Sequence, residues 1–285
     1  MNQSQITKRV LKRSTLYCTL TIVLVAMIFP ILWVVLTSIK PSIYTFAIPP
    51  QWIFTPTLES YKQLFLSGFA ALGVDMWLNL QNSVIIAVVS TIITIIVSCY
   101  AAYGLSRFRF PGREAMALMI IATRMLPPVG TMIPFFLLIN SLGLLDTKTA
   151  LIMAYTALNI PFATWMLRGF FDEVPKELDE AAMVDGCNRN KMLWRILAPL
   201  IAPGMAATCV FSFLLSWNDF ALALMLASRN SKTLPLIVTS FITDEGIFWG
   251  PMSAAATVVL VPPIVLMLFS QRHLAKGLTM GAVKG

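Results

Sequence analysis

Charged residues are scarce in this sequence, and the residue patterns of several kinds of functional site are absent from it. Only 12% of the 285 residues are Asp, Glu, Lys or Arg, whereas a soluble chain carries about 25%. The single histidine, His273, excludes a multi-histidine metal site. The sequence has no G-x-x-x-x-G-K-[ST] phosphate loop, so we do not expect the chain to bind ATP by that device. Together these shortages argue against an enzymatic site.

The four cysteines are few and far apart, and no two of them form a metal-like pair. Three lie in apolar runs and one lies in a basic-rich loop. We therefore interpret them as reduced packing residues and not as a disulfide framework. They are Cys18, Cys99, Cys187 and Cys209.

Apolar residues, in contrast, are abundant. They make up 58% of the chain and give a mean hydropathy of +0.79, which indicates that the solvent is lipid. Each of six apolar runs is about as long as the 20 residues that cross a bilayer. The sequence thus predicts an all-α membrane protein whose spans lie at about 16–37, 82–105, 115–139, 150–167, 199–227 and 251–270.

The positions of Lys and Arg predict the orientation of these spans. Fifteen of the 21 basic residues fall on one side of the predicted spans and five on the other, with Arg124 inside the third span. Because short cytoplasmic loops carry an excess of basic residues, we expect both termini in the cytoplasm. This pattern explains the net charge of +8 without a nucleic-acid partner. The predicted organisation is a cytoplasmic tail (1–15), a six-helix transmembrane domain (16–270) and a second cytoplasmic tail (271–285).

The longest charged stretch, residues 168–198, has the punctuation of two short helices. Pro175 suits a first helical position, and Gly186 suits the position just past a helix end. Asn188 is placed to cap a second short helix. Leu178, Ala181, Ala182 and Asp185 are spaced so that they form one partly apolar face. This physical reading leaves two alternatives open, a solvated loop on the lipid headgroups and a docking element.

Motifs along most of the chain resemble those of a known family. The series Glu180-Ala181-Ala182, Asp185-Gly186, Ile196, Pro199 and Pro203 resembles the EAA motif of ABC importer permeases. Further segments resemble the maltose-type (MalG-like) sugar permeases of that family. They are Asn82-Ser83, Ala101-Ala102-Tyr103-Gly104, Arg107-Phe108, Arg124-Met125-Leu126-Pro127, Trp217-Asn218-Asp219-Phe220 and the segment from Gly277 to Gly285.

The resemblance implies a type I ABC importer permease in a bacterial inner membrane. Such a chain forms half of a translocation pathway for a carbohydrate and binds no cofactor itself. The implied partners are a second homologous permease, a dimer of ATP-binding subunits that holds ATP and Mg²⁺, an extracytoplasmic solute-binding protein and the lipid bilayer. The residues that the resemblance assigns to ATPase coupling are Glu180, Ala181, Ala182, Asp185, Gly186 and Pro199, and those of the ATPase-facing tail are Gly277, Leu278, Gly281 and Lys284.

Three polar residues inside the predicted spans are candidates for the translocation pathway. Arg124 lies in the third span, and Asn218 and Asp219 lie near the outer end of the fifth. A charge inside a span usually faces protein or a water-filled cavity. Arg124 and Asn218 are expected to face the pathway or to brace a neighbouring helix, and snorkelling to the surface is a further alternative for Asp219.

Two other functions are compatible with a multi-span chain. An ion-coupled secondary transporter is one alternative, but we find no internal repeat of the kind such proteins show. An ABC permease for a solute other than a sugar is the second alternative.

Overall fold

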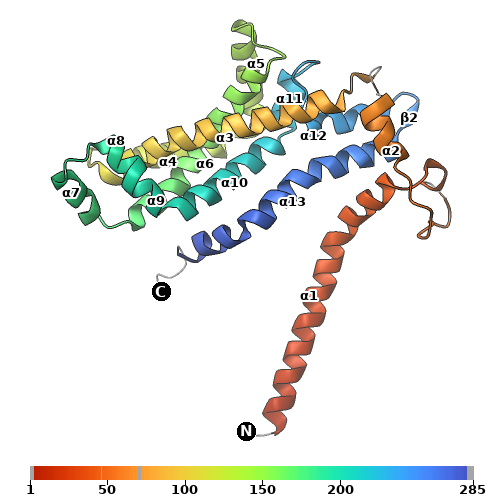
Figure 1. Ribbon diagram of the computed structural model, residues 1–285, viewed down its shortest axis with the longest axis horizontal. Coiled ribbons are helices and arrows are strands. Elements are labelled where there is room, and N and C mark those ends of the chain that lie inside the picture. Colours follow the sequence, from red (N-terminus) through yellow and green to blue (C-terminus); the bar gives the residue numbers. More distant parts are fainter. Residues whose placement is uncertain (1–2, 46, 68, 70–71, 281–285) are drawn as a thin grey trace. The chain divides into compact units, whose positions relative to one another are not determined.

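The structure of the chain, a computed structural model, describes residues 3–45, 47–67, 69 and 72–280, and most of them are helical (Figure 1). The α-helices of this part are α1 (Gln3–Ser38), α2 (Glu59–Lys62), α3 (Met76–Arg107), α4 (Arg113–Ala122), α5 (Pro128–Ser141), α6 (Lys148–Glu173), α7 (Glu177–Val184), α8 (Arg189–Met192), α9 (Ala198–Leu200), α10 (Ala202–Trp217), α11 (Ala221–Leu226), α12 (Leu234–Ile237) and α13 (Trp249–Met280). Short 3₁₀ or π segments are η1 (Ser42–Tyr44), η2 (Gln63–Ser67), η4 (Thr123–Met125), η5 (Leu193–Leu197) and η6 (Val238–Phe241). Strands β1 (Ile242–Thr243) and β2 (Gly246–Ile247) form a small antiparallel hairpin, which the sequence analysis did not predict.

Among the described residues, four helices are long and apolar enough to cross a membrane. They lie at Lys12–Ser38, Met76–Arg107, Lys148–Glu173 and Trp249–Gln271. Two further helix pairs pass the same test together, but each pair is sharply bent. The bends are 94° between Arg113–Met125 and Gly130–Ser141, and 86° between Arg189–Leu200 and Ala202–Trp217. The described chain therefore holds four candidate spans, or six if each bent pair is one span.

Proline accounts for the first bend and accompanies the second. In the third apolar run the sequence predicts interruptions at Pro127-Pro128 and at Pro134, because proline has no N–H to donate and crowds the preceding turn. The run breaks at Pro127-Pro128, whereas Pro134 lies inside α5. Near the second bend, Pro203 occupies the first turn of α10. At the end of the chain, α13 extends to Met280, well past the expected end of the sixth run at residue 270.

The described residues divide into two compact units. The first contains residues up to 72 together with 240–258, and the second contains 73–239 together with 259–280. Within the first unit, most large apolar side chains between residues 16 and 32 of α1 are exposed. Lys40, just beyond α1, is only 5% exposed. Its Nζ lies 5.0 Å from the Trp33 ring centroid and donates to the Gln51 carbonyl oxygen at 3.0 Å, so the charge is held among aromatic and polar groups.

In the second unit, α3, α6 and α10 pack side by side (Figure 1). Their contact faces carry small and hydroxyl side chains, as is typical of helices that associate inside lipid. Ser90 Oγ of α3 donates to Ser216 Oγ of α10 at 3.1 Å, and Asn159 Nδ2 of α6 donates to the same oxygen at 2.9 Å. The three helices are thus joined by a buried polar network.

Asp146, between α5 and α6, binds a second loop of the same unit. Its carboxylate accepts hydrogen bonds from the backbone N–H groups of Ser228, Arg229, Asn230 and Ser231 at 2.9–3.1 Å. Desolvation raises the pKa of this carboxyl, but the four N–H donors outweigh it and lower the pKa to about 2. The carboxylate therefore stays ionised at neutral pH and fixes the 228–231 loop.

Helix α10 packs against Phe170 of α6 at Gly204. A Cβ atom built on Gly204 would lie 2.3 Å from Cγ of Phe170, well inside van der Waals contact. By contrast, a Cβ built on Gly169, the neighbour of Phe170, would meet nothing within 4 Å. The packing of α10 on α6 therefore requires glycine at position 204.

Replacing Gly204 with alanine is expected to destabilise the protein by about 1–3 kcal/mol, because the added methyl group overpacks the interface. The matched change Gly169→Ala is expected to be neutral or stabilising, since alanine is the better helix former. Thermal unfolding in detergent micelles, followed by size-exclusion chromatography, measures both. An unchanged melting temperature for Gly204→Ala would contradict the assigned packing.

Candidate functional site

The charged segment between α6 and α10 forms two short helices around a glycine. Helix α7 covers Glu177–Val184, and Gly186 follows it with φ +77°, a left-handed conformation that suits glycine. Asn188 caps α8, because its Oδ1 accepts from the Lys191 N–H at 2.9 Å. The predicted turn and cap are therefore present, but α7 begins at Glu177 and not at Pro175. We call residues 174–197 the knuckle.

The inner side of the knuckle packs on the ends of α3 and α6. Ala182 and Asp179 are the buried residues of α7. Ala182 belongs to an apolar cluster that joins the knuckle to both helices. The other fully buried members are Cys99, Ala102, Tyr103, Leu167, Phe171, Met192, Leu193, Leu197 and Ile201.

A charge pair ties α7 to the end of α3. Arg107 Nε lies 2.7 Å from Asp179 Oδ2, and the two side chains are only 5% and 11% exposed. Arg107 Nη2 also donates to the Val174 carbonyl oxygen at 3.0 Å, where α6 ends. Desolvation raises the pKa of Asp179, and the attraction of Arg107 offsets only part of this rise. Because burying both charges is costly, this pair fixes position more than it adds stability.

Neutral hydrogen bonds make the same connection at α8. Tyr100 Oη of α3 donates to Asn190 Oδ1 at 2.8 Å, and Trp194 Nε1 donates to Tyr100 Oη at 2.9 Å. Beside the knuckle, α3 and α6 are joined directly, because Ser106 Oγ of α3 donates to Asp172 Oδ1 of α6 at 2.5 Å. The knuckle is therefore attached to α3 and α6 at several separate points.

The outer side of α7 remains exposed in this chain. The expected single face of Leu178, Ala181, Ala182 and Asp185 is wrong, because Ala182 faces inward while the other three are exposed. Helical spacing alone did not show that Asp179 and Ala182 form the inner, buried side of α7. The outer surface combines apolar and acidic side chains, of which Val184 is 88% exposed. Its exposed residues are Leu178, Glu180, Ala181, Met183, Val184, Asp185 and Gly186, and Pro199 of α9 is exposed as well.

The structure describes two of the four residues assigned to the ATPase-facing tail. Gly277 and Leu278 lie within α13. Gly281 and Lys284 lie outside the described residues, so their prediction remains untested.

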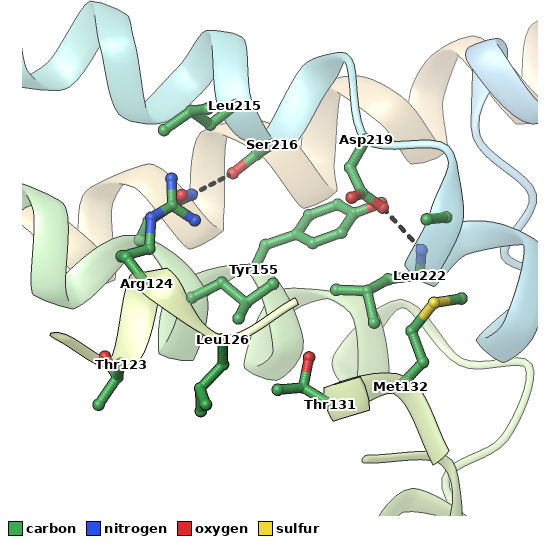
Figure 2. Close-up of a pocket in the computed structure, with 13 residues that line it drawn as sticks. Thr123, Arg124, Leu126, Thr131, Met132, Tyr155, Leu215, Ser216, Asp219 and Leu222 are labelled. Atoms are coloured by element: carbon green, nitrogen blue, oxygen red, sulfur yellow. Dashed lines mark hydrogen bonds between the residues drawn. The ribbon is translucent and has the colours of Figure 1, made fainter. Parts of the chain in front are cut away.

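Far along the unit from the knuckle, Arg124 and Asp219 line one cavity of about 170 Å³. Arg124 belongs to η4, where the third apolar run breaks, and Asp219 lies in the break between α10 and α11. Figure 2 shows Tyr155 of α6 between them, with its hydroxyl directed toward the Asp219 carboxylate. The remaining lining residues are Thr123, Leu126, Thr131, Met132, Leu158, Asn159, Leu215, Ser216, Ala221 and Leu222.

Asp219 has a structural role besides lining the cavity. Its Oδ1 accepts from the Leu222 N–H at 3.0 Å and from the Ala223 N–H at 3.4 Å, so it caps the start of α11. Asn218 does not line the cavity, and its Nδ2 donates back to the Leu214 carbonyl oxygen at 2.9 Å. Of the three intramembrane candidates, the structure thus brings two together and separates the third.

The sequence analysis missed Tyr155, Asn159 and Ser216 in this cavity. Tyr155 and Asn159 are four residues apart in an otherwise apolar run, and this spacing puts both side chains on one face of a helix. The sequence therefore carried a signal for a polar face on this helix. No group of three His, Cys, Asp or Glu in the described part of the chain is arranged to hold a metal ion.

Comparisons with known proteins connect these features to a family. Residues 94–280 match the family described as "Binding-protein-dependent transport system inner membrane component". The chain is 39% identical to the probable ABC transporter permease protein y4oR of Sinorhizobium fredii, over 99% of this chain and 98% of that protein. It is 33% identical to the trehalose/maltose transport system permease protein MalG of Thermococcus litoralis, over 98% and 99%. Its fold is similar to a crystal structure of a bacterial ABC transporter that imports the polysaccharide alginate, with a TM-score of 0.74 and 21% identity over 95% of this chain and 98% of the other.

Replacing Asp179 with asparagine is expected to loosen the knuckle, because the isosteric change leaves the buried Arg107 charge unpaired at a cost of about 3–5 kcal/mol. Hydrogen–deuterium exchange of the α7 peptide should become faster. The control Glu114→Gln removes a carboxylate that is 62% exposed and should leave exchange in α7 unchanged. Wild-type exchange in the Asp179 variant would contradict a positioning role for this pair.

Proposed function

We propose that this chain, which belongs to the family of binding-protein-dependent transport system inner membrane components, forms half of the translocation pathway of an ATP-driven carbohydrate importer. Family membership makes it an inner-membrane transport subunit and not an enzyme. The observation that carries the coupling part of the proposal is the exposed outer side of α7 on a knuckle whose inner side is fixed to α3 and α6.

The proposed arrangement in the membrane has six spans with both termini in the cytoplasm. Each bent helix pair then counts as one span, and the excess of basic residues lies on the side of the knuckle. In this arrangement residues 1–15 and 271–285 are cytoplasmic tails and 16–270 form the transmembrane domain. The extension of α13 to Met280 carries the last span toward the cytoplasm as a continuous helix.

The proposed partners cover surfaces that the single chain leaves exposed. A separate ATPase dimer, which holds ATP and Mg²⁺, docks on the outer side of α7 through Glu180, Ala181, Asp185 and Gly186. A second, homologous permease completes the pathway, and an extracytoplasmic binding protein delivers the solute. The family description, which names a binding-protein-dependent system, supports this assembly.

Coupling then has a simple mechanical form. When the ATPase dimer closes, it displaces α7, and the contacts of the knuckle transmit the displacement to α3 and α6. The buried pair Arg107–Asp179 and the apolar cluster around Ala182 make this transmission direct, because closely packed interiors do not deform continuously. Pro199 and the tail residues Gly277, Leu278, Gly281 and Lys284 are proposed to support the same interface.

The solute is proposed to be a sugar or a related glycoside. The relative from Thermococcus litoralis, a trehalose/maltose permease, supports a carbohydrate. An ABC permease for a non-sugar solute is the alternative, and it predicts that no sugar-loaded binding protein stimulates ATP hydrolysis. An ion-coupled transporter is disfavoured, since the family depends on a binding protein.

The changes Glu180→Lys and Gly186→Val are expected to lower solute-stimulated ATP hydrolysis and uptake about tenfold or more. The first reverses a charge on the outer side of α7, and the second strains a residue at φ +77°. The assay uses the complete complex, co-purified with its partners and reconstituted into vesicles with the loaded binding protein. Membrane insertion should remain intact in both variants.

Glu245→Lys, an equal charge reversal in the exposed β1–β2 turn, serves as the control and should retain ATP hydrolysis coupled to uptake. Normal coupled transport by both knuckle variants would exclude the outer side of α7 as the coupling surface.

A further inference from the structure

The cavity around Tyr155 lies where two helix breaks meet. One break separates η4 from α5 at Pro127, and the other separates α10 from α11 at Asp219. Interrupted helices at membrane depth are tolerated where their free backbone groups face protein or a water-filled cavity. Two such breaks on one cavity therefore indicate a polar space inside the membrane-spanning part of the unit.

Arg124 has no charged partner within the described residues, and Asp219 is satisfied only in part, by two N–H groups of α11 and by the Tyr155 hydroxyl that faces its carboxylate. Arg124 is exposed, and the ion pairs found in the described part of the chain do not include it. Asp219 uses Oδ1 to cap α11, and neither of those two N–H groups binds Oδ2. A guanidinium in an apolar run is costly unless water, protein or a polar solute satisfies it. Helix bracing within this chain thus explains Asp219 in part but does not explain Arg124.

The size and lining of the cavity indicate what kind of molecule it accepts. Its volume of about 170 Å³ slightly exceeds the roughly 150 Å³ that accommodates a benzene ring in a protein core. The six-membered ring of a pyranose therefore fits, with its hydroxyl groups at the lining side chains or at the mouth of the cavity. Guanidinium donors at one end and a carboxylate acceptor at the other favour a ring with hydroxyl groups over a hydrocarbon. Tyr155 lies between them and offers its ring as an apolar contact (Figure 2).

We propose that this cavity is a solute subsite that holds one sugar ring, with Arg124 and Asp219 as hydrogen-bonding groups and Tyr155 as the contact between them. The inference rests on the proposed function as a carbohydrate importer. It goes further by assigning solute recognition to this subunit and to named residues. The guanidinium donates to ring hydroxyls, Asp219 Oδ2 accepts from them, and Asn159 and Ser216 fix the wall behind Arg124 through their hydrogen bond.

The first test measures selectivity in the reconstituted complex with saturating amounts of binding protein loaded with maltose or with a deoxymaltose that lacks one hydroxyl of a terminal ring. The variants Arg124→Lys and Asp219→Asn each alter one polar contact, and Tyr155→Leu removes the aromatic ring contact. Asp219→Asn retains a carbonyl oxygen that can cap α11. Losing one hydrogen bond worth about 1 kcal/mol changes a rate about fivefold. We expect the ratio of the two uptake rates to change by about this factor. The control Arg229→Gln, in an exposed loop outside the cavity, should leave the ratio at its wild-type value.

The second test measures access to the cavity without regard to transport. In a complex whose four native cysteines are replaced, Thr123→Cys lines the cavity, while Met119→Cys lies on the exposed side of α4 outside it. A water-soluble thiosulfonate reagent should label position 123 faster than position 119. The transported sugar, delivered by the binding protein, should slow labelling at position 123.

The outcomes distinguish failure of the proposed subsite from failure of the proposed function. Equal losses for both sugars in all three cavity variants, or no labelling at position 123, would overturn the subsite while sugar import stands. If neither sugar, nor any in a wider panel, stimulates ATP hydrolysis by the wild-type complex, the proposed carbohydrate function fails and the sugar subsite fails with it. A changed uptake ratio together with sugar-protected labelling supports the subsite.

Discussion

The Arg107 guanidinium connects the end of α3 to the segment from the end of α6 to α7, some seventy residues later in the sequence, and the position of the knuckle depends on it. It lies at the end of α3, pairs with Asp179 of α7 at 2.7 Å and donates to the carbonyl oxygen of Val174 just after α6. Because the pair is nearly excluded from solvent, either charge alone would be costly in this place. With α7 in this position Ala182 packs into the apolar cluster, and the opposite side of α7 is left exposed.

The helices to which the knuckle is attached are joined by small and polar side chains as well as by clusters of large apolar ones. Ser90, Asn159 and Ser216 link α3, α6 and α10, and Gly204 allows close contact between α10 and Phe170 of α6. Ser216 and Asn159 also line the cavity, so the network that holds the helices together reaches the proposed solute subsite. At the knuckle end the same helices α3 and α6 meet α7 and α8 (Figure 1). These contacts give the proposed coupling a continuous path from the knuckle to the cavity.

Composition and periodicity predicted the helical class, the apolar runs, the break at Pro127–Pro128, the glycine turn at Gly186 and the cap at Asn188. These features depend on local chemistry, and the structure confirms them. The predicted single face of α7 was wrong. The side of α7 that packs inward is set by the contact of Asp179 with Arg107, which lies some seventy residues earlier in the sequence. The hydrogen bonds from the 228–231 loop to Asp146 likewise join segments that are distant in the sequence. The same is true of the cavity that Arg124 and Asp219 both line. Nothing within a short window of sequence encodes such contacts, although Tyr155 and Asn159 carried a local signal of a polar helix face.

The central claim, that the knuckle moves as one body with α3, is tested most directly by a distance measured between two spin labels in the reconstituted complex. Lys191→Cys places one label on an exposed site of α8 in the knuckle, and Ile93→Cys places the other on an exposed site of α3, in a chain without its native cysteines. Pulsed electron paramagnetic resonance then compares the nucleotide-free complex with the complex trapped in ATP. The account predicts the same distance distribution within the chain in both states, while the distance between the label at position 191 and the partner permease changes. A shift between positions 191 and 93 on ATP binding would contradict it.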